Sequence, residues 1–153
     1  MGVLERLTRP RPRYDARRER DAEEQARALM RSVVSEREFA MYEELGFIGV
    51  EGAGGGYAFL LYPHRPIVAY ETASGRLLSE YCVRFDDRSA PGAARRLPGA
   101  DDVLAKWMSL RGGEQELIAV ANLDPPGRQH DPEQVRRDLG SLEAWQRRQA
   151  TLD

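Results

Sequence analysis

A single cysteine and two histidines are the side chains of this 153-residue chain best suited to nucleophilic or metal chemistry. Cys82 and His64 could pair a thiolate with an imidazole, a combination that is reactive at neutral pH. Cys82, however, lies between Tyr81 and Val83 in an apolar run, where a buried cysteine is usually inert. His64 and His130 lie in proline-containing turns without acidic neighbours at ligand spacing, which favours solvent-facing side chains. We therefore predict no catalytic residue, no metal site and no cofactor.

A glycine-rich run at residues 52–56 could close its backbone amides around a phosphate. Its context differs from that of a phosphate loop, because Tyr57 begins another β-rich run where a dinucleotide fingerprint or P-loop needs a helix. A kinase-type loop would require a strand lysine soon afterwards, and the chain has no lysine except Lys106. The run is more typical of a flexible hairpin tip.

An arginine-rich N-terminal arm is the strongest candidate for partner binding. Seven arginines against three acidic residues leave a charge of +4 over residues 1–20, whereas the whole chain carries −2. Alternating arginine and proline at residues 9–13 favours an extended segment. The arm could contact an acidic protein surface or nucleic-acid phosphate, or it could be a solvated tail. The candidate electrostatic contacts are Arg9, Arg11, Arg13, Arg17 and Arg18.

The elements that must position these residues follow from hydrophobic periodicity. Helical spacing predicts a helix over residues 14–34, and Ser35 with Glu38 forms a capping box for a second helix that Gly46 ends. Aromatic and branched runs then predict strands at residues 47–50, 57–62, 67–70 and 77–85. The short connections favour a four-stranded antiparallel meander.

The C-terminal third is predicted to be helical. Asp101 and Asp102 favour a helix start, Gly112 and Gly113 a stop, and residues 114–122 a second short helix. A last amphipathic helix begins near Pro132, after a proline and glycine break. Its apolar face could dock on a neighbouring subunit. The candidate apolar contacts are Leu139, Leu142 and Trp145.

The hydrophobic content of 41% supports one compact core. We expect an extended basic arm (residues 1–13), a single α+β domain (14–123) in which N- and C-terminal helices pack a small meander, and a C-terminal linker with an amphipathic helix (124–153). No apolar run approaches the ~20 residues that span a bilayer, and the arginine-rich start lacks a signal-peptide pattern. A soluble protein without membrane contacts is expected, cytoplasmic or part of a virion.

Motifs between Phe39 and Asn122 carry a resemblance to a known family. They are Phe39-x-x-Tyr42-Glu43-x-x-Gly46-Phe47, Tyr81-Cys82, Leu97-Pro98-x-x-Asp101-x-x-Leu104-Ala105-Lys106 and Ile118-Ala119-x-Ala121-Asn122. This stretch resembles a family of small uncharacterised proteins of phage, prophage and other mobile sequence. Where that family has a basic strand pair and a Cys-x-His-Pro motif, this chain has an apolar strand after Tyr57 and Phe85 at the end of Cys82-Val83-Arg84-Phe85. The difference implies packing or assembly for the sheet, in place of nucleic-acid or metal binding.

These observations favour a non-enzymatic structural or assembly protein, such as a minor capsid or accessory protein of a virion. Its partners would be protein subunits, either further copies of itself or a major structural protein. The first alternative is a nucleic-acid-binding accessory protein that uses the arm. The second is a small enzyme or ligand-binding domain centred on the glycine hairpin, His64 and Cys82, and it requires a concave pocket.

Overall fold

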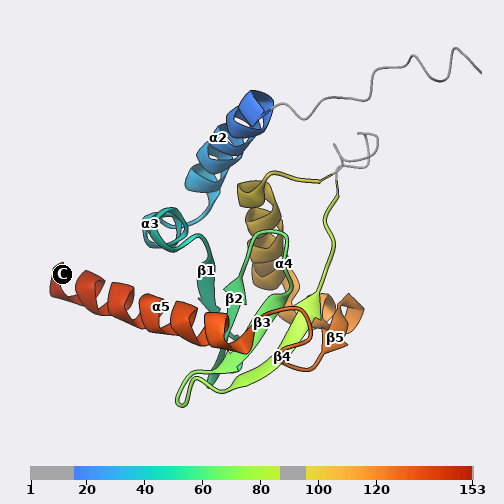
Figure 1. Ribbon diagram of the computed structural model, residues 1–153, viewed down its shortest axis with the longest axis vertical. Helices are drawn as coiled ribbons and strands as arrows, with labels where there is room; N and C mark the ends of the chain where they lie inside the picture. The colour runs from blue at the N-terminus through green and yellow to red at the C-terminus, as the bar shows by residue number, and fades with distance from the viewer. Residues whose placement is uncertain (1–15, 87–95, 153) are drawn as a thin grey trace, which may run out of the picture.

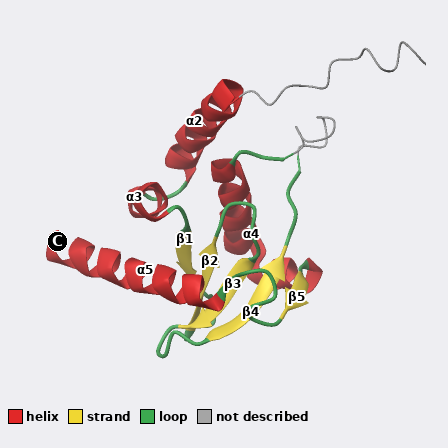
Figure 2. Ribbon diagram, viewed as in Figure 1, coloured by secondary structure: helices red, strands yellow, loops and turns green. Residues whose placement is uncertain are grey.

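The computed structural model describes residues 16–86 and 96–152 (Figure 1). Within these ranges the predicted α+β class is confirmed, with four helices and a five-stranded antiparallel sheet (Figure 2). The predicted arm, with Arg9, Arg11 and Arg13, lies outside the described residues. In chain order the elements are α2 (Ala16–Val33), α3 (Glu36–Leu45), β1 (Ile48–Glu51), β2 (Tyr57–Leu61), β3 (Ile67–Glu71), β4 (Leu77–Cys82), α4 (Gly99–Val120), β5 (Asn122–Asp124) and α5 (Pro132–Leu152).

The sheet is a simple meander in the order β1-β2-β3-β4-β5. The four predicted strands are present, and a fifth, β5, pairs with the outer edge of β4, with Leu123 opposite Tyr81. The prediction that Asn122 belongs to a helix was wrong. A three-residue strand is too short to show alternation, and it forms because the end of α4 returns the chain alongside the free edge of β4.

Helix α4 consists of two helical segments joined at a kink, as the glycine pair predicted. The break lies at the expected place but consists of one residue, Gly113, whose backbone angles are φ −177° and ψ 81°. Leu117 is buried beyond it, so the second half of α4 still packs on the core. The kink redirects Glu114 toward the β1–β2 hairpin.

Helices cover both faces of the sheet. Alternation places Tyr57 and Gly49 on opposite faces, because Gly49 pairs with Leu60 in β2. Tyr57 hydrogen-bonds to Glu114 of α4, whereas a Cβ atom on Gly49 would lie 3.1 Å from Leu142 of α5. Helix α5 therefore crosses one face and α4 lies on the other (Figure 1).

The N-terminal helices pack on this core as local signals predicted. The capping box is confirmed: Glu38 N–H donates to Ser35 Oγ at 3.1 Å, Ser35 N–H donates to Glu38 Oε1 at 3.2 Å, and Gly46 ends α3 at φ 82°. Helix α2 packs on α4, where Glu23 accepts a hydrogen bond from the Ala100 N–H at 3.2 Å. A carboxylate at this position satisfies a helix N-terminus.

Helix α5 packs into the same core as the sheet, although residues 124–153 were expected to form a linker and helix outside the α+β domain. Val135, Leu142 and Trp145 are 1%, 3% and 0% exposed and join the hydrophobic cluster of the strands. The outer turns of α5 extend past the sheet to the C-terminal end in Figure 1.

Candidate functional site

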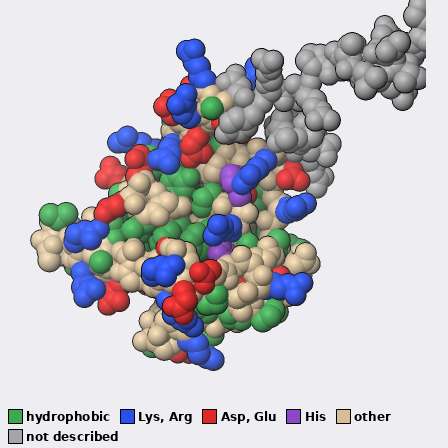
Figure 3. All heavy atoms as spheres, in the orientation of Figure 1, with side chains coloured by type: hydrophobic (Ala, Val, Ile, Leu, Met, Phe, Trp, Pro, Cys, Tyr) green, Lys and Arg blue, Asp and Glu red, His purple; other side chains and the backbone are tan. Residues whose placement is uncertain are grey.

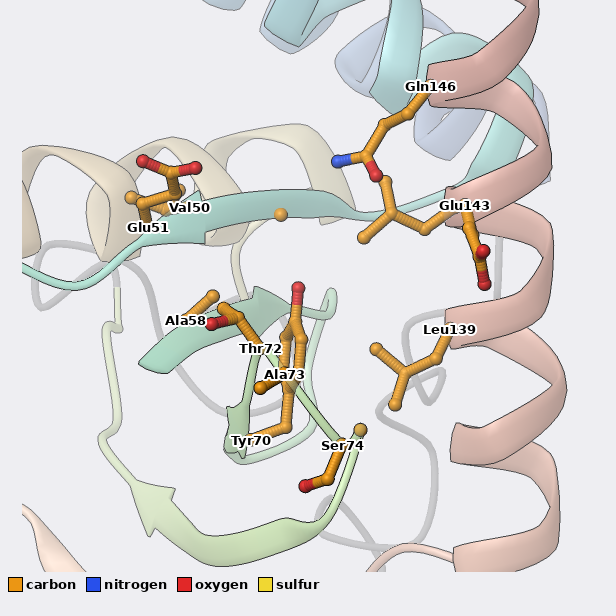
Figure 4. Close-up of a pocket in the computed structure, with 13 residues that line it drawn as sticks. Val50, Glu51, Ala58, Tyr70, Thr72, Ala73, Ser74, Leu139, Glu143 and Gln146 are labelled. Carbon is orange, nitrogen blue, oxygen red and sulfur yellow. The ribbon is translucent and has the colours of Figure 1, made fainter. Parts of the chain in front are cut away.

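An open groove lies where α5 leaves part of the sheet uncovered. It has a volume of about 420 Å³ and is bounded by β1, β2, β3, the β3–β4 turn and α5. In Figure 4 the Tyr70 ring stands in the groove with its hydroxyl pointing toward β1, while Leu139 and Glu143 extend from α5. We call this surface the acidic groove and define it by Glu51, Ala58, Tyr70, Leu139, Glu143 and Gln146.

The charged side chains that line the acidic groove are all acidic. Glu51 and Glu143 line it, and none of the described residues that line it is lysine or arginine. Burial and, secondarily, the charge of Glu51 raise the pKa of Tyr70 above its usual value. Within the part of the chain that the structure describes, the Tyr70 hydroxyl forms no hydrogen bond. The lining of the groove therefore offers a ligand an aromatic ring, a hydroxyl with no partner in the described part of the chain, and two carboxylates, of which Glu143 Oε1 lies 3.8 Å from Arg147 Nη2.

Buried Glu80 fixes the loop that places α5 beside the groove. Its carboxylate accepts hydrogen bonds from the backbone N–H groups of Gly127, Gln129 and His130 at 2.9, 2.8 and 3.3 Å. His130 Nε2 lies 2.8 Å from the Pro66 carbonyl oxygen, and its side chain is buried, so the prediction that it faces solvent was wrong. Both residues therefore have a structural role in setting the start of α5.

A buried ion pair joins α4 to the β2–β3 turn. The Lys106 ammonium donates to Asp102 Oδ2 at 2.6 Å and to the carbonyl oxygens of Tyr62 and Arg65 at 2.7 and 2.8 Å. Burial lowers the pKa of Lys106. Its three N–H bonds all have acceptors, which is the arrangement of a structural brace. Sequence reasoning placed Asp102 at a helix start and missed this brace, although a sole lysine four residues after an aspartate was a usable signal.

Cys82 and His64, the candidate nucleophile and base, both line a second hollow, between the β2–β3 turn and the end of β4. Cys82 is half-buried at the end of β4, and exposed His64 has a left-handed backbone with φ 63°. His64 Nε2 lies 2.6 Å from the Leu97 carbonyl oxygen, so the ring already has a partner. Among the described residues no cluster of three histidine, cysteine, aspartate or glutamate side chains could hold a metal ion.

The glycine-rich hairpin tip is held by a carboxylate of the chain itself. Glu114 accepts hydrogen bonds from the Ala53 N–H at 3.0 Å and from the Tyr57 hydroxyl at 2.5 Å. Gly55 and Gly56 have φ values of 76° and 83°, which glycine adopts without strain. The amide that a phosphate would have used at Ala53 is therefore already bound to an internal anion.

The predicted partner residues separate into three groups. Arg17 and Arg18 lie on the exposed first turn of α2. Leu139 is half-buried and lines the acidic groove; Leu142 also lines it but is only 3% exposed, and Trp145 is fully buried inside the chain. Arg9, Arg11 and Arg13 are outside the described residues.

Comparisons with known proteins identify no relative: no family model, curated protein or solved structure matches the chain. No helix within the described ranges is long and apolar enough to cross a bilayer.

Proposed function

We propose that the chain is a non-enzymatic structural protein of a larger assembly, in which the arginine-rich arm of one subunit docks in the acidic groove of a neighbour. The observation that carries this proposal is the uncovered part of the sheet beside α5, with Glu51 and Glu143 at its border and Tyr70 within it. The resemblance to small phage and prophage proteins makes a virion the proposed assembly.

The chemistry of the arm matches the groove. Residues 9–13 alternate arginine and proline, a composition that favours the extended polyproline conformation. Proline-rich segments of this kind bind grooves lined by aromatic rings, the place that Tyr70 occupies here. The aliphatic stems of the arginines would lie on Ala58 and Leu139, and their guanidinium groups would pair with the two carboxylates.

Charge reversal on either side tests the proposal. The masses of three full-length proteins are measured by light scattering: the natural chain, Arg9→Glu/Arg11→Glu/Arg13→Glu, and Glu51→Lys/Glu143→Lys. The natural chain is expected to associate, and each variant alone to be monomeric because its arm and groove then carry like charge. An equimolar mixture of the two variants is expected to associate again, since each arm meets a groove of opposite sign.

Glu51→Gln/Glu143→Gln should lower the mass of the assembly. The matched control is Glu24→Gln/Glu116→Gln, which removes two exposed carboxylates outside the groove and should leave that mass unchanged. Association that survives both charge reversals would overturn the docking. A monomer that co-purifies with nucleic acid, released by salt and lost with the arm arginines, would replace it with the nucleic-acid-binding alternative.

A further inference from the structure

A second hollow, of about 560 Å³, opens between the β2–β3 turn, the end of β4 and the start of α4. Lys106 and Asp102 form its floor through the brace described above, and Asp102 Oδ2 also accepts the His64 N–H at 2.8 Å. Histidines with several lysine or arginine side chains around them are visible on the face shown in Figure 3. The floor of this hollow is thus rigid before any ligand binds.

Three arginines surround this hollow without partners. The guanidinium groups of Arg65, Arg84 and Arg96 form no hydrogen bond or ion pair within the described part of the chain. Exposed Arg136 on α5, by contrast, is paired with Glu133 at 2.6 Å. The lining contains four positive side chains, the three arginines and Lys106, and two carboxylates, those of Asp86 and Asp102. Its net charge is therefore +2. Such a concave positive surface concentrates anions.

An aromatic side chain lies beside the arginines. Strand β4 ends at Cys82, three residues before the predicted strand end, and the chain continues unpaired until an isolated bridge joins Asp86 and Arg96. Phe85 lies in this stretch, is half-buried and lines the hollow, and it is not among the side chains packed against the main core. Phe85 therefore supplies an aromatic ring to the lining of the hollow.

We infer that this hollow, the arginine pocket, binds a nucleotide, with the phosphate on Arg65, Arg84 and Arg96 and the base on Phe85. A guanidinium group matches the geometry of phosphate oxygens with paired donors, and aromatic stacking accepts any base. The nucleotide could be free or part of a single strand, since both present a phosphate next to a base. The site does not depend on the proposed arm docking, because none of its residues belongs to the arm or the acidic groove.

The test titrates the full-length protein at low salt with adenosine monophosphate, with an oligothymidylate and with inorganic phosphate, followed by amide NMR shifts. Adenosine monophosphate is expected to shift the amides of His64, Arg84 and Phe85. Arg65→Ala/Arg84→Ala/Arg96→Ala should weaken nucleotide binding by about tenfold or more, because it removes charge-assisted hydrogen bonds. Phe85→Ala should weaken the binding of adenosine monophosphate and leave that of inorganic phosphate unchanged.

Controls separate the pocket from charge in general. Arg136→Ala/Arg137→Ala/Arg147→Ala removes the same charge from α5 and should leave the affinity within about twofold, as is usual for distant surface charges at modest salt. Arg9→Gln/Arg11→Gln/Arg13→Gln should also retain binding of adenosine monophosphate. The single variant Arg84→Ala repeats the test if the triple variant is poorly folded.

The outcomes are distinct. Tighter binding of adenosine monophosphate identifies a free nucleotide as the source, tighter binding of the oligothymidylate identifies a single strand, and both support the site. Three results would each overturn the site. The first is an equal loss of affinity in the pocket and α5 triple variants. The second is inorganic phosphate binding as tightly as the nucleotide with no effect of Phe85→Ala, and the third is no amide shift at the pocket with any probe.

Discussion

Lys106 and Asp102 form an ion pair whose energetic role depends on its burial. The 2.6 Å bond between Nζ and Oδ2 has an exposed counterpart of equal length between Arg136 and Glu133. The side chains of the first pair are 2% and 7% exposed, and those of the second are 59% and 71% exposed. Water screens the exposed pair, whereas loss of one partner leaves an uncompensated charge in the buried pair.

Lys106→Met is therefore expected to lower the free energy of unfolding by about 3 kcal/mol, because Asp102 and two carbonyl oxygens lose their donor. Arg136→Met should change it by less than about 0.5 kcal/mol. Urea unfolding of both variants measures the contrast. Equal costs for the two substitutions would show that the buried pair has no special role.

Tyr62 should make stability sensitive to alkaline pH. Burial and a hydrogen bond to Asp138 raise the pKa of Tyr62 well above its usual value of 10.0. As the pH rises through 10.0, Tyr62 of the unfolded chain loses its phenolic proton while Tyr62 of the folded chain keeps it. Rising pH therefore favours the unfolded state. At neutral pH, Tyr62→Phe should cost about 1 kcal/mol for the lost hydrogen bond.

The difference in unfolding free energy between the natural chain and Tyr62→Phe is expected to shrink as the pH rises above 10.0. The lowered pKa of Lys106 contributes the opposite slope, but it is present in both proteins and cancels in the difference. Urea denaturation at a series of alkaline pH values measures this difference. A gap that stays constant with pH would contradict the assignment.

At the scale of elements, the kink in α4 and the β1–β2 hairpin form one unit. Gly113 interrupts the helix, and Glu114 then accepts hydrogen bonds from Ala53 and Tyr57, more than fifty residues away in the chain. A glycine-rich tip loses much conformational entropy on folding, so a fixed acceptor at its base is needed to order it.

Glu114→Ala should loosen this tip without unfolding the chain. Hydrogen exchange at the Ala53 amide is expected to accelerate by about tenfold, since its acceptor is removed and the local opening energy falls. Glu116→Ala, which removes an exposed carboxylate two residues further along α4, serves as the control and should leave exchange at the Ala53 amide unchanged. Unaltered exchange in Glu114→Ala would mean that the glycines order the tip without help.

At the scale of the whole molecule, α5 completes the core. Trp145 is fully buried with the Arg37 guanidinium 5.2 Å from its ring, although its amphipathic helix follows a proline and glycine break that suggested an appended segment. The indole N–H of Trp145 has no hydrogen-bond partner among the described residues. Its contribution to stability is therefore a matter of packing.

Trp145→Ala is expected to lower the free energy of unfolding by about 4 kcal/mol through the cavity that it leaves. Trp145→Phe should cost much less, because it retains an aromatic ring and removes a donor that has no acceptor. Leu152→Ala on the same helix, at a position that is 79% exposed, should have almost no effect. Thermal unfolding ranks the three variants. If Trp145→Ala left the stability unchanged, Trp145 would again be a candidate for partner binding.

Local signals in the sequence were sufficient to predict most of the helices and strands. The Ser35 capping box, the Gly46 stop, the helical spacing before Val34 and the four β-rich runs encode structure over a few residues, so they could be recognised without knowing what they contact. Antiparallel pairing followed because each connection is short.

Only the tertiary structure decided which polar and aromatic side chains became internal. The carbonyl partners of Lys106 and the partners of Glu80 and Glu114 lie 41 to 61 residues away. The fifth strand exists only as an edge partner of β4, and the acidic groove appears only once α5 crosses the sheet. The physical reason is that periodicity reports the face on which a residue lies, whereas burial depends on which distant element covers that face. The sequence by itself thus determined the α+β elements and their order, and the packing of α4 and α5 on opposite faces determined the brace, the groove and the arginine pocket.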